Sequence, residues 1–220
     1  MKNKIIKINS HPRSGTNFLG ALLKENFYTY DDMSVSGQWG HWNNRQTFKS
    51  PVLHGKLFGD HSFKNNRNPK IYIYRDGRSV ALSVWKSQHF LNKNIKGISF
   101  SDFLKYKLDW EGSPNTRVKP KYNIITHWLK HVETWHNFLD KSFMIIRYED
   151  LLINTEKVLY DISKFYGLDF IDGVKKITTM VGPSPNKGNH DEWKKYFTKN
   201  DEEYFYSIVN KENKFLYDGL

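Results

Sequence analysis

The chain has 220 residues, no cysteine and a formal net charge of +11 at pH 7 with histidine counted as neutral. This length suits one domain, residues 1–220, with enough buried surface for a full core. The lack of cysteine excludes disulfides and thiolate metal sites, and no apolar stretch approaches the roughly 18 residues of a membrane-spanning helix. No secretory signal pattern is visible either, so we expect a cytoplasmic protein without a membrane span, whose positive charge favours anionic partners.

The first structural unit spans residues 5–27, with the sequence IIKINSHPRSGTNFLGALLKENF. Its opening apolar run is short enough for a buried strand, and Pro12 ends that run because proline lacks a backbone donor. After a tight turn at residues 13–16, apolar residues recur at helical spacing. A strand, a glycine turn and a helix direct free backbone N–H groups and the positive end of the helix dipole at the loop. The unit therefore predicts an anion site.

The turn departs from the usual phosphate-binding pattern GxxxxGK[ST]. Anchored on Gly15, that pattern requires glycine at Ser10 and lysine at Thr16. It also requires a magnesium-binding hydroxyl at Asn17, and none of the three is present. The cation precedes the glycine instead, as Arg13. We infer a site for a phosphate-like group outside a metal-bound triphosphate; the alternative is an ordinary surface turn that carries one arginine.

The remaining elements alternate between strands and helices. Apolar runs predict strands at residues 51–58, closed by Gly59 and Asp60, and at 69–75 and 143–146. Helical spacing predicts helices after residue 77, around 128–139, and at 155–167, 172–180 and 200–209, with a short amphipathic piece at 100–108. Residues 28–50 and 92–121 are predicted to be mostly irregular. This order indicates an α/β fold with three layers, α/β/α, around a central, mainly parallel sheet, as in P-loop-like nucleotide-binding folds.

A second anion site is predicted where the strand at residues 69–75 ends. Arg75 offers a planar set of donors there, and Ser83, eight residues on, can direct a hydroxyl to the same crevice. Ligands of parallel sheets bind beyond the carboxyl ends of the strands, so Arg13, Arg75 and Tyr148 should converge. Two cationic sites suggest a ligand with phosphates at two positions; the alternative is a charged strand-to-helix turn.

A metal site is not expected. His127 and His131 are four residues apart, but no glutamate completes an HExxH arrangement and no third ligand has a recognised spacing. We expect these histidines to flank an apolar stripe formed by Trp128 and Trp135.

Four ordered motifs resemble the sulfotransferases that use 3′-phosphoadenosine 5′-phosphosulfate (PAPS): HPRSGTNFL, IYRDGRSVALSVWK, MIIRYEDLLINTEKVLYDISKFYGL and NKGNHDEWKKYF. The resemblance touches most of the chain. It implies that the first loop holds the 5′-phosphosulfate, through Arg13, Ser14, Gly15, Thr16, Asn17 and Phe18. It assigns the 3′-phosphate to Arg75 and Ser83, the surroundings of the adenine to Tyr148, and a loop that closes over the 3′-phosphate to Asn186, Lys187 and Gly188.

The sequence departs from the family's pattern at three places. Arg13 stands where lysine is common, and we expect its high pKa to make it a poorer proton donor. Asn186 replaces the usual arginine, and Asp191 and Glu192 precede Trp193 where Gly-Asp is commoner. None of these changes removes a group that the chemistry requires.

The resemblance implies transfer of a sulfuryl group from PAPS to a hydroxyl of a carbohydrate or small-molecule acceptor, with PAP as the product and no metal. Arg13 would stabilise the leaving nucleotide, and a histidine of near-neutral pKa would act as the base. The family's base sits at the end of the strand that precedes the Arg75 strand. His54 and His61 are both candidates there. The spacing to Arg75 favours His54, whereas His61 falls just past the predicted strand end, nearer to the expected crevice.

Two other functional classes and an inactive relative remain as alternatives. A P-loop small-molecule kinase is disfavoured by Thr16 and Asn17, which break its pattern. A nucleic-acid-binding module would more often show a dense basic run, and none is present, so we expect no nucleic-acid partner. A non-catalytic relative that keeps only the fold is disfavoured by the Arg75 and Ser83 pair.

Overall fold

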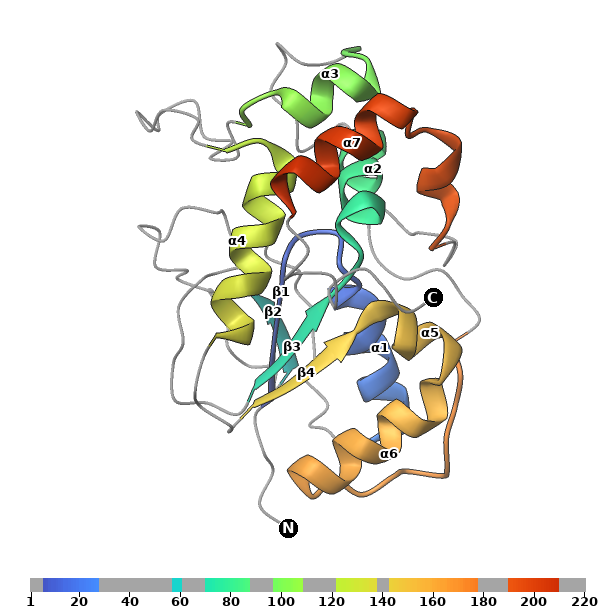
Figure 1. The fold of residues 1–220 in the computed structure, drawn as a ribbon. Coiled ribbons are helices and arrows are strands. Elements are labelled where there is room, and N and C mark those ends of the chain that lie inside the picture. The colour runs from blue at the N-terminus through green and yellow to red at the C-terminus, as the bar shows by residue number, and fades with distance from the viewer. Residues whose placement is uncertain are drawn as a thin grey trace.

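A computed structural model of the chain describes residues 6–27, 57–60, 70–87, 97–108, 122–137, 143–177 and 190–209 (Figure 1). Four strands form one sheet in the order β2-β1-β3-β4: β1 Ile6–Ser10, β2 Leu57–Asp60, β3 Lys70–Tyr74 and β4 Phe143–Arg147. Every neighbouring pair is parallel. The described helices are α1 Thr16–Asn26, α2 Gly77–Ser87, α3 Phe100–Lys105, α4 Ile124–His136, α5 Tyr148–Ile153, α6 Thr155–Tyr166, the 3₁₀ helix η2 Glu192–Lys195 and α7 Lys199–Ile208.

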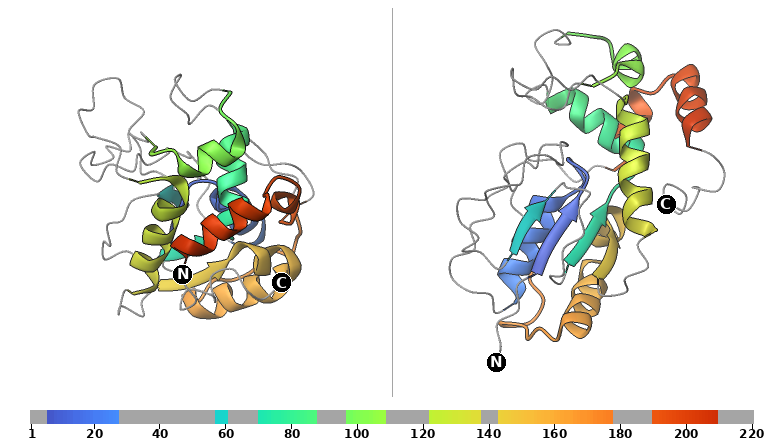
Figure 2. Two further views of the ribbon diagram at one scale, coloured as in Figure 1. Left: turned by 45° about the horizontal axis from the view of Figure 1, so that its top comes forward. Right: turned by 90° about the vertical axis from the view of Figure 1, so that its left-hand side faces the viewer.

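The sheet lies between two helical layers, which confirms the predicted three-layer α/β fold. Successive side chains of a strand point to opposite faces, and β3 shows this alternation. Ile71 and Ile73 pack in a core with residues of α1 and α6, whereas Tyr72 and Tyr74 pack in a second core with α2, α3, α4 and α7. All strands run toward the end of the molecule that carries α2, α3 and α7 (Figures 1 and 2). The strand tips therefore lie under those helices.

Three predicted elements need correction. Strand β2 continues through Gly59 and Asp60, which were expected to close it, because both pair with β1. Tyr148 begins α5 directly after β4, where only the end of a strand was predicted.

The predicted helix at residues 172–180 is wrong over its described part, since residues 171–177 are not helical. The end of α1 holds this segment instead: the Ile171 N–H donates to the carbonyl oxygen of Asn26 at 2.9 Å, and the Lys175 N–H donates to Asn26 Oδ1 at 2.6 Å. A long-range polar contact therefore overrides the local helical spacing.

The helices of the described ranges are short. The longest, α4, has 13 residues, whereas a helix needs about 20 apolar residues to cross a bilayer. Within these ranges, no helix combines the length and the apolar character that a membrane crossing requires.

Candidate nucleotide-binding site

The β1–α1 loop has the conformation of an anion-binding turn. Arg13 and Gly15 both have positive φ, at 68° and 95°, and α1 begins after Gly15 without a side-chain cap. The first N–H groups of a helix have no partner within it, so they face the loop. The hydroxyl of the fully buried Ser14 has no hydrogen-bond partner among the described residues. The Thr16 hydroxyl bonds to that of Ser10 instead. The loop thus presents donors without an internal acceptor.

Tyr148 closes the other side of this loop. A Cβ on Gly15 would lie 2.3 Å from Cδ2 and 2.7 Å from Cε2 of the Tyr148 ring, so only glycine allows this approach. Phe18, on the first turn of α1, meets the same ring edge-on, with centroids 6.1 Å apart. The aromatic side chain at the tip of β4 is therefore packed directly against the turn at the tip of β1.

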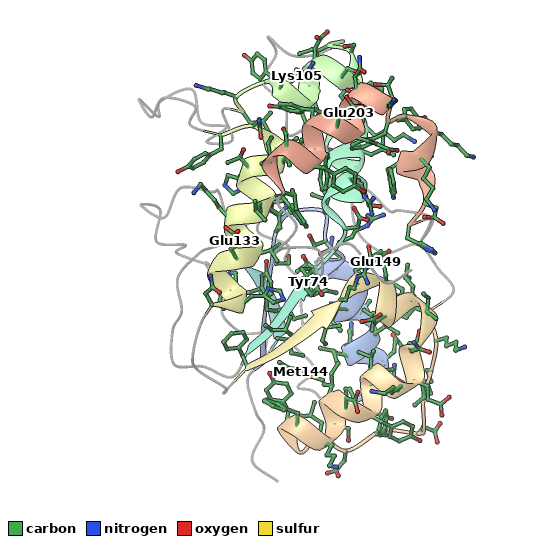
Figure 3. The ribbon with its side chains drawn as sticks, in the orientation of Figure 1. Tyr74, Lys105, Glu133, Met144, Glu149 and Glu203 are labelled. Carbon is green, nitrogen blue, oxygen red and sulfur yellow. The ribbon has the colours of Figure 1, made fainter. Side chains whose placement is uncertain are left out.

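The three predicted strand ends meet at one place. Arg13 Nε donates to Ser83 Oγ at 2.9 Å, and Arg75 Nη1 lies 3.4 Å from the carbonyl oxygen of Arg13. The Arg75 guanidinium also stands over the Tyr148 ring, 4.8 Å from its centroid. Arg75, Ser83 and Tyr148 are buried, and Arg13 is half-buried. Figure 3 shows Tyr74 and Glu149 at the same end of the sheet.

Burial changes the acid–base character of Arg13. Desolvation and the neighbouring Arg75 guanidinium lower the pKa of Arg13 to about 10, against a smaller opposing effect of Tyr148. This value is close to the ordinary pKa of lysine, about 10.4. Burial therefore makes Arg13 a better proton donor than an exposed arginine, whereas its strength relative to a lysine at the same position stays a prediction. Burial lowers the pKa of Arg75 as well, and nearby Tyr148, Glu149 and Asp76 oppose that shift.

The turn between β3 and α2 makes supporting contacts beside the site that the sequence analysis did not identify. Asp76 caps α2, because Oδ1 accepts the Arg78 N–H at 2.7 Å. The Arg78 guanidinium bonds to the Asp76 carboxylate, with Nε 3.0 Å from Oδ1, and stacks on the Trp193 ring at 3.9 Å. Ser79 Oγ donates to the carbonyl oxygen of His190 at 2.7 Å. An aspartate before a helix is a capping signal, but the contacts with residues 190–193 have no local signature.

Several predicted site residues lie outside the described ranges: the base candidates His54 and His61, and the loop residues Asn186, Lys187 and Gly188. Asn17 lies in the first turn of α1 and is half-buried. The functions assigned to His54, His61, Asn186, Lys187 and Gly188 stay predictions, as do those assigned to the site residues that the structure describes.

His127 and His131 pack behind the loop. The ring centroid of His11 lies 5.6 Å from that of His127 and 5.5 Å from that of His131, and the Tyr72 hydroxyl is 2.9 Å from His131 Nδ1. Burial, together with the two neighbouring imidazoles, lowers the pKa of His127 well below its usual value. In the part of the chain that the structure describes, no set of three or more His, Cys, Asp or Glu side chains is arranged to hold a metal ion.

Comparisons with known proteins give both a family and a fold. No curated protein matches the chain. The solved structure of mouse sulfotransferase SULT7A1 complexed with PAP has a TM-score of 0.61 at 18% identity. The match covers 98% of this chain and 89% of the mouse protein's chain. Retinol dehydratase in complex with androsterone and PAP has a TM-score of 0.56 at 16% identity, over 98% of this chain and 82% of its own. At this identity, both likenesses concern the fold.

The family model of the sulfotransferase domain matches residues 53–181. The matched region contains Arg75, Ser83 and Tyr148, and it begins after the loop that carries Arg13. More than half of the sequence lies within it, and the chain therefore belongs to the sulfotransferase domain family.

Proposed function

We propose that this protein transfers a sulfuryl group from PAPS to a hydroxyl of a small-molecule or carbohydrate acceptor in the cytoplasm. The observation that carries the proposal is the link from Arg13 to Ser83, at 2.9 Å, together with the approach of Arg75 to the Arg13 carbonyl. These contacts join the two predicted anion sites into one. Membership of the sulfotransferase domain family supports the reaction type, and both solved structures described above are complexes with PAP.

The residues at the loop fit the phosphosulfate end of PAPS. The Ser14 hydroxyl, buried and without a hydrogen-bond partner among the described residues, would gain an acceptor from such a group. The Arg13 guanidinium and the first N–H groups of α1 add positive charge and donors. A buried donor that lacks a protein partner usually has a ligand or water partner. The loop is therefore suited to hold one end of the nucleotide.

Arg75 and Ser83 fit the 3′-phosphate end. Arg75 is buried, and its planar guanidinium can bind two phosphate oxygens at once. Its stacking against Tyr148 leaves an aromatic ring beside the same site. The proposed capping residues Asn186, Lys187 and Gly188 precede His190 by two to four positions. The His190 carbonyl accepts the Ser79 hydroxyl, one helical turn before Ser83, so the chain enters the neighbourhood of the site.

The reaction needs positive charge on the side of the leaving nucleotide. PAPS supplies the sulfuryl group when it is bound, and negative charge grows on the departing phosphate as the acceptor oxygen attacks in line. Arg13 is placed to stabilise that charge from within the loop. Its pKa of about 10 keeps it protonated at neutral pH and makes its proton more acidic than that of an ordinary arginine.

For the base, we propose His61 rather than His54. In a parallel sheet all carboxyl ends lie at one edge, and β2 ends at Asp60, which pairs with Asn9 of β1. In the sequence, His61 comes directly after that end, as Arg75 comes directly after the end of β3, and Arg13 comes three positions after the end of β1. In the sequence, His54 comes three positions before Leu57, the first residue of β2. The position of the strand thus outweighs the spacing that favours His54.

A nucleotide comparison tests the donor site. PAP at about 100 times its dissociation constant should stabilise the protein by about 2.7 kcal/mol, which raises the melting temperature by about 5–11 °C for a chain of this size. AMP, which lacks the 3′-phosphate, should give a clearly smaller shift at equal concentration. Equal shifts for PAP and AMP would refute the 3′-phosphate site.

Turnover tests the reaction and the base. Incubation with PAPS labelled in the sulfuryl group and a panel of phenols, alcohols and sugars should yield a labelled, sulfated acceptor. His61→Asn should abolish transfer while PAP still raises the melting temperature, and His54→Asn should leave transfer close to that of the wild type. The reverse result would move the base to His54.

A further inference from the structure

The fully buried carboxylate of Glu149 has no role in the reaction described above. It lies at the start of α5, beside Tyr148 (Figure 3). Glu149 Oε1 accepts the backbone N–H of Asp76 at 3.0 Å, and Oε2 is 3.3 Å from Arg147 Nε. Burial raises the pKa of Glu149, whereas the hydrogen bond from Asp76 opposes that rise. A carboxylate is rarely buried this completely unless its partners require it.

The peptide unit between Arg75 and Asp76 is held on both of its polar atoms. Its N–H donates to Glu149, and its carbonyl oxygen, on Arg75, accepts the indole N–H of Trp128 at 3.0 Å. These two partners come from opposite helical layers. The Trp128 ring also lies tight against the turn, since a Cβ on Gly77 would come within 2.6 Å of it. The peptide plane therefore cannot rotate without breaking a buried hydrogen bond.

The Cα of Arg75 belongs to this peptide plane, so a held plane restrains the direction in which the Arg75 side chain leaves the backbone. We propose that Glu149 is a positioning residue for 3′-phosphate recognition, acting on Arg75 through the N–H of Asp76. This inference rests on the proposed function, because Arg75 binds the 3′-phosphate there. Glu149 does not touch the nucleotide; it holds the peptide that carries the arginine. Charge is the competing explanation, since Glu149 also lies close enough to Arg75 to favour its protonated form.

Two conservative variants separate the hydrogen bond from the charge. Glu149→Gln keeps an acceptor oxygen at the same reach and removes the charge. Glu149→Asp keeps the charge and withdraws the carboxylate by one methylene, beyond hydrogen-bonding distance of the Asp76 N–H. Glu156→Gln and Glu156→Asp are the matched controls, because Glu156 is an exposed carboxylate in the first turn of α6. Melting curves of all variants without nucleotide establish that each is folded.

The measurement is the ratio of the dissociation constants of AMP and PAP, obtained by titration calorimetry. A change in fold stability alone would alter both constants together, whereas a displaced Arg75 alters the one for PAP. We expect Glu149→Asp to lower the ratio by about tenfold with little change in AMP affinity, and Glu149→Gln to stay within about threefold of the wild type. Both Glu156 variants should match the wild type.

The outcomes distinguish this inference from the function on which it rests. A wild-type protein that binds AMP and PAP alike overturns the proposed function, and the inference with it. If Glu149→Asp keeps the wild-type ratio of the AMP and PAP dissociation constants, the positioning function of Glu149 is overturned and the proposed function is not. A loss of the ratio in Glu149→Gln also overturns it, because an acceptor of the correct reach would then be insufficient and charge would be the cause.

Discussion

Replacement of Gly15 by alanine tests the packing of the loop against Tyr148. The substitution has two costs. Gly15 has φ 95°, and a left-handed conformation costs an alanine about 1–2 kcal/mol. The new Cβ would also lie 2.3 Å from the Tyr148 ring, where ordinary carbon contacts are about 3.5–4.0 Å. The ring must therefore move by more than about 1 Å, and such overpacking costs about 1–3 kcal/mol.

Gly97 provides a control that carries only the first cost. It has φ 83°, and a Cβ built on it would meet no heavy atom within 4 Å. Both alanine substitutions restrict the unfolded chain to the same extent, so this contribution cancels in their comparison. We expect Gly15→Ala to be less stable than Gly97→Ala by about 1–3 kcal/mol. For a chain of this size the melting temperatures should then differ by about 2–12 °C.

Thermal unfolding and PAP binding together provide the assay. Because the Arg75 guanidinium stands over the Tyr148 ring, displacement of that ring should weaken PAP binding by tenfold or more in Gly15→Ala. Gly97→Ala should bind PAP as the wild type does. If the two variants melt at the same temperature and bind PAP equally, Tyr148 is not packed against the loop as described and does not line the proposed PAP site.

Three further results are expected around Arg13. Ser83→Ala removes the acceptor of Arg13 Nε. Because a hydrogen bond to a charged group contributes about 1.5–3 kcal/mol, calorimetry should show a PAP affinity at least about tenfold lower. An unchanged affinity would contradict this expectation. Since the pKa of Arg13 is about 10, PAP affinity should change little between about pH 7 and 9. It should fall as the pH rises through about 10, where Arg13 loses its proton. An affinity that stays constant to about pH 11 would show that the pKa of Arg13 is not lowered. Arg13→Gly should melt at or above the wild-type temperature, because glycine tolerates φ 68° and no cation remains beside Arg75. The same variant should lose PAP binding. A melting temperature several degrees below that of the wild type would mean that Arg13 supports the fold.

The part of the fold that sequence predicts well depends on local signals. The apolar runs and helical spacing locate β1, α1, β3 and α2, and the parallel-sheet rule then brings Arg13, Arg75 and Tyr148 to one edge. The failures have a different origin. Helix α5 has only six residues, too few for a periodic pattern. The segment after α6 has helical spacing but bonds to the end of α1, through contacts that span more than 140 positions.

The candidate site shows the same division. Arg13 and Arg75 stand beside glycine turns that begin helices, and those turns mark them in the sequence. Ser83 lies in the middle of α2 and is identified by its spacing of eight from Arg75. Glu149 has no such turn beside it, and the function proposed for it depends on the closeness of the Asp76 N–H, 73 positions earlier in the chain. The contact of Arg78 with Trp193 depends likewise on how the C-terminal part folds back on α2. Supporting residues of a site are set by three-dimensional packing, which a single sequence does not display.

Arg13 combines three features that each work against the stability of the free protein. It is the single non-glycine residue in the described ranges with positive φ. Its cation is partly desolvated, and a second guanidinium, that of Arg75, lies nearby and lowers its pKa. Ser83 supplies a neutral acceptor, which offsets these costs only in part. A phosphate or sulfonate would remove the electrostatic cost, because an anion restores the solvation that burial takes away and screens one guanidinium from the other. Backbone strain and charge crowding at one residue thus favour occupancy by an anion, which is the property a sulfuryl-donor site requires.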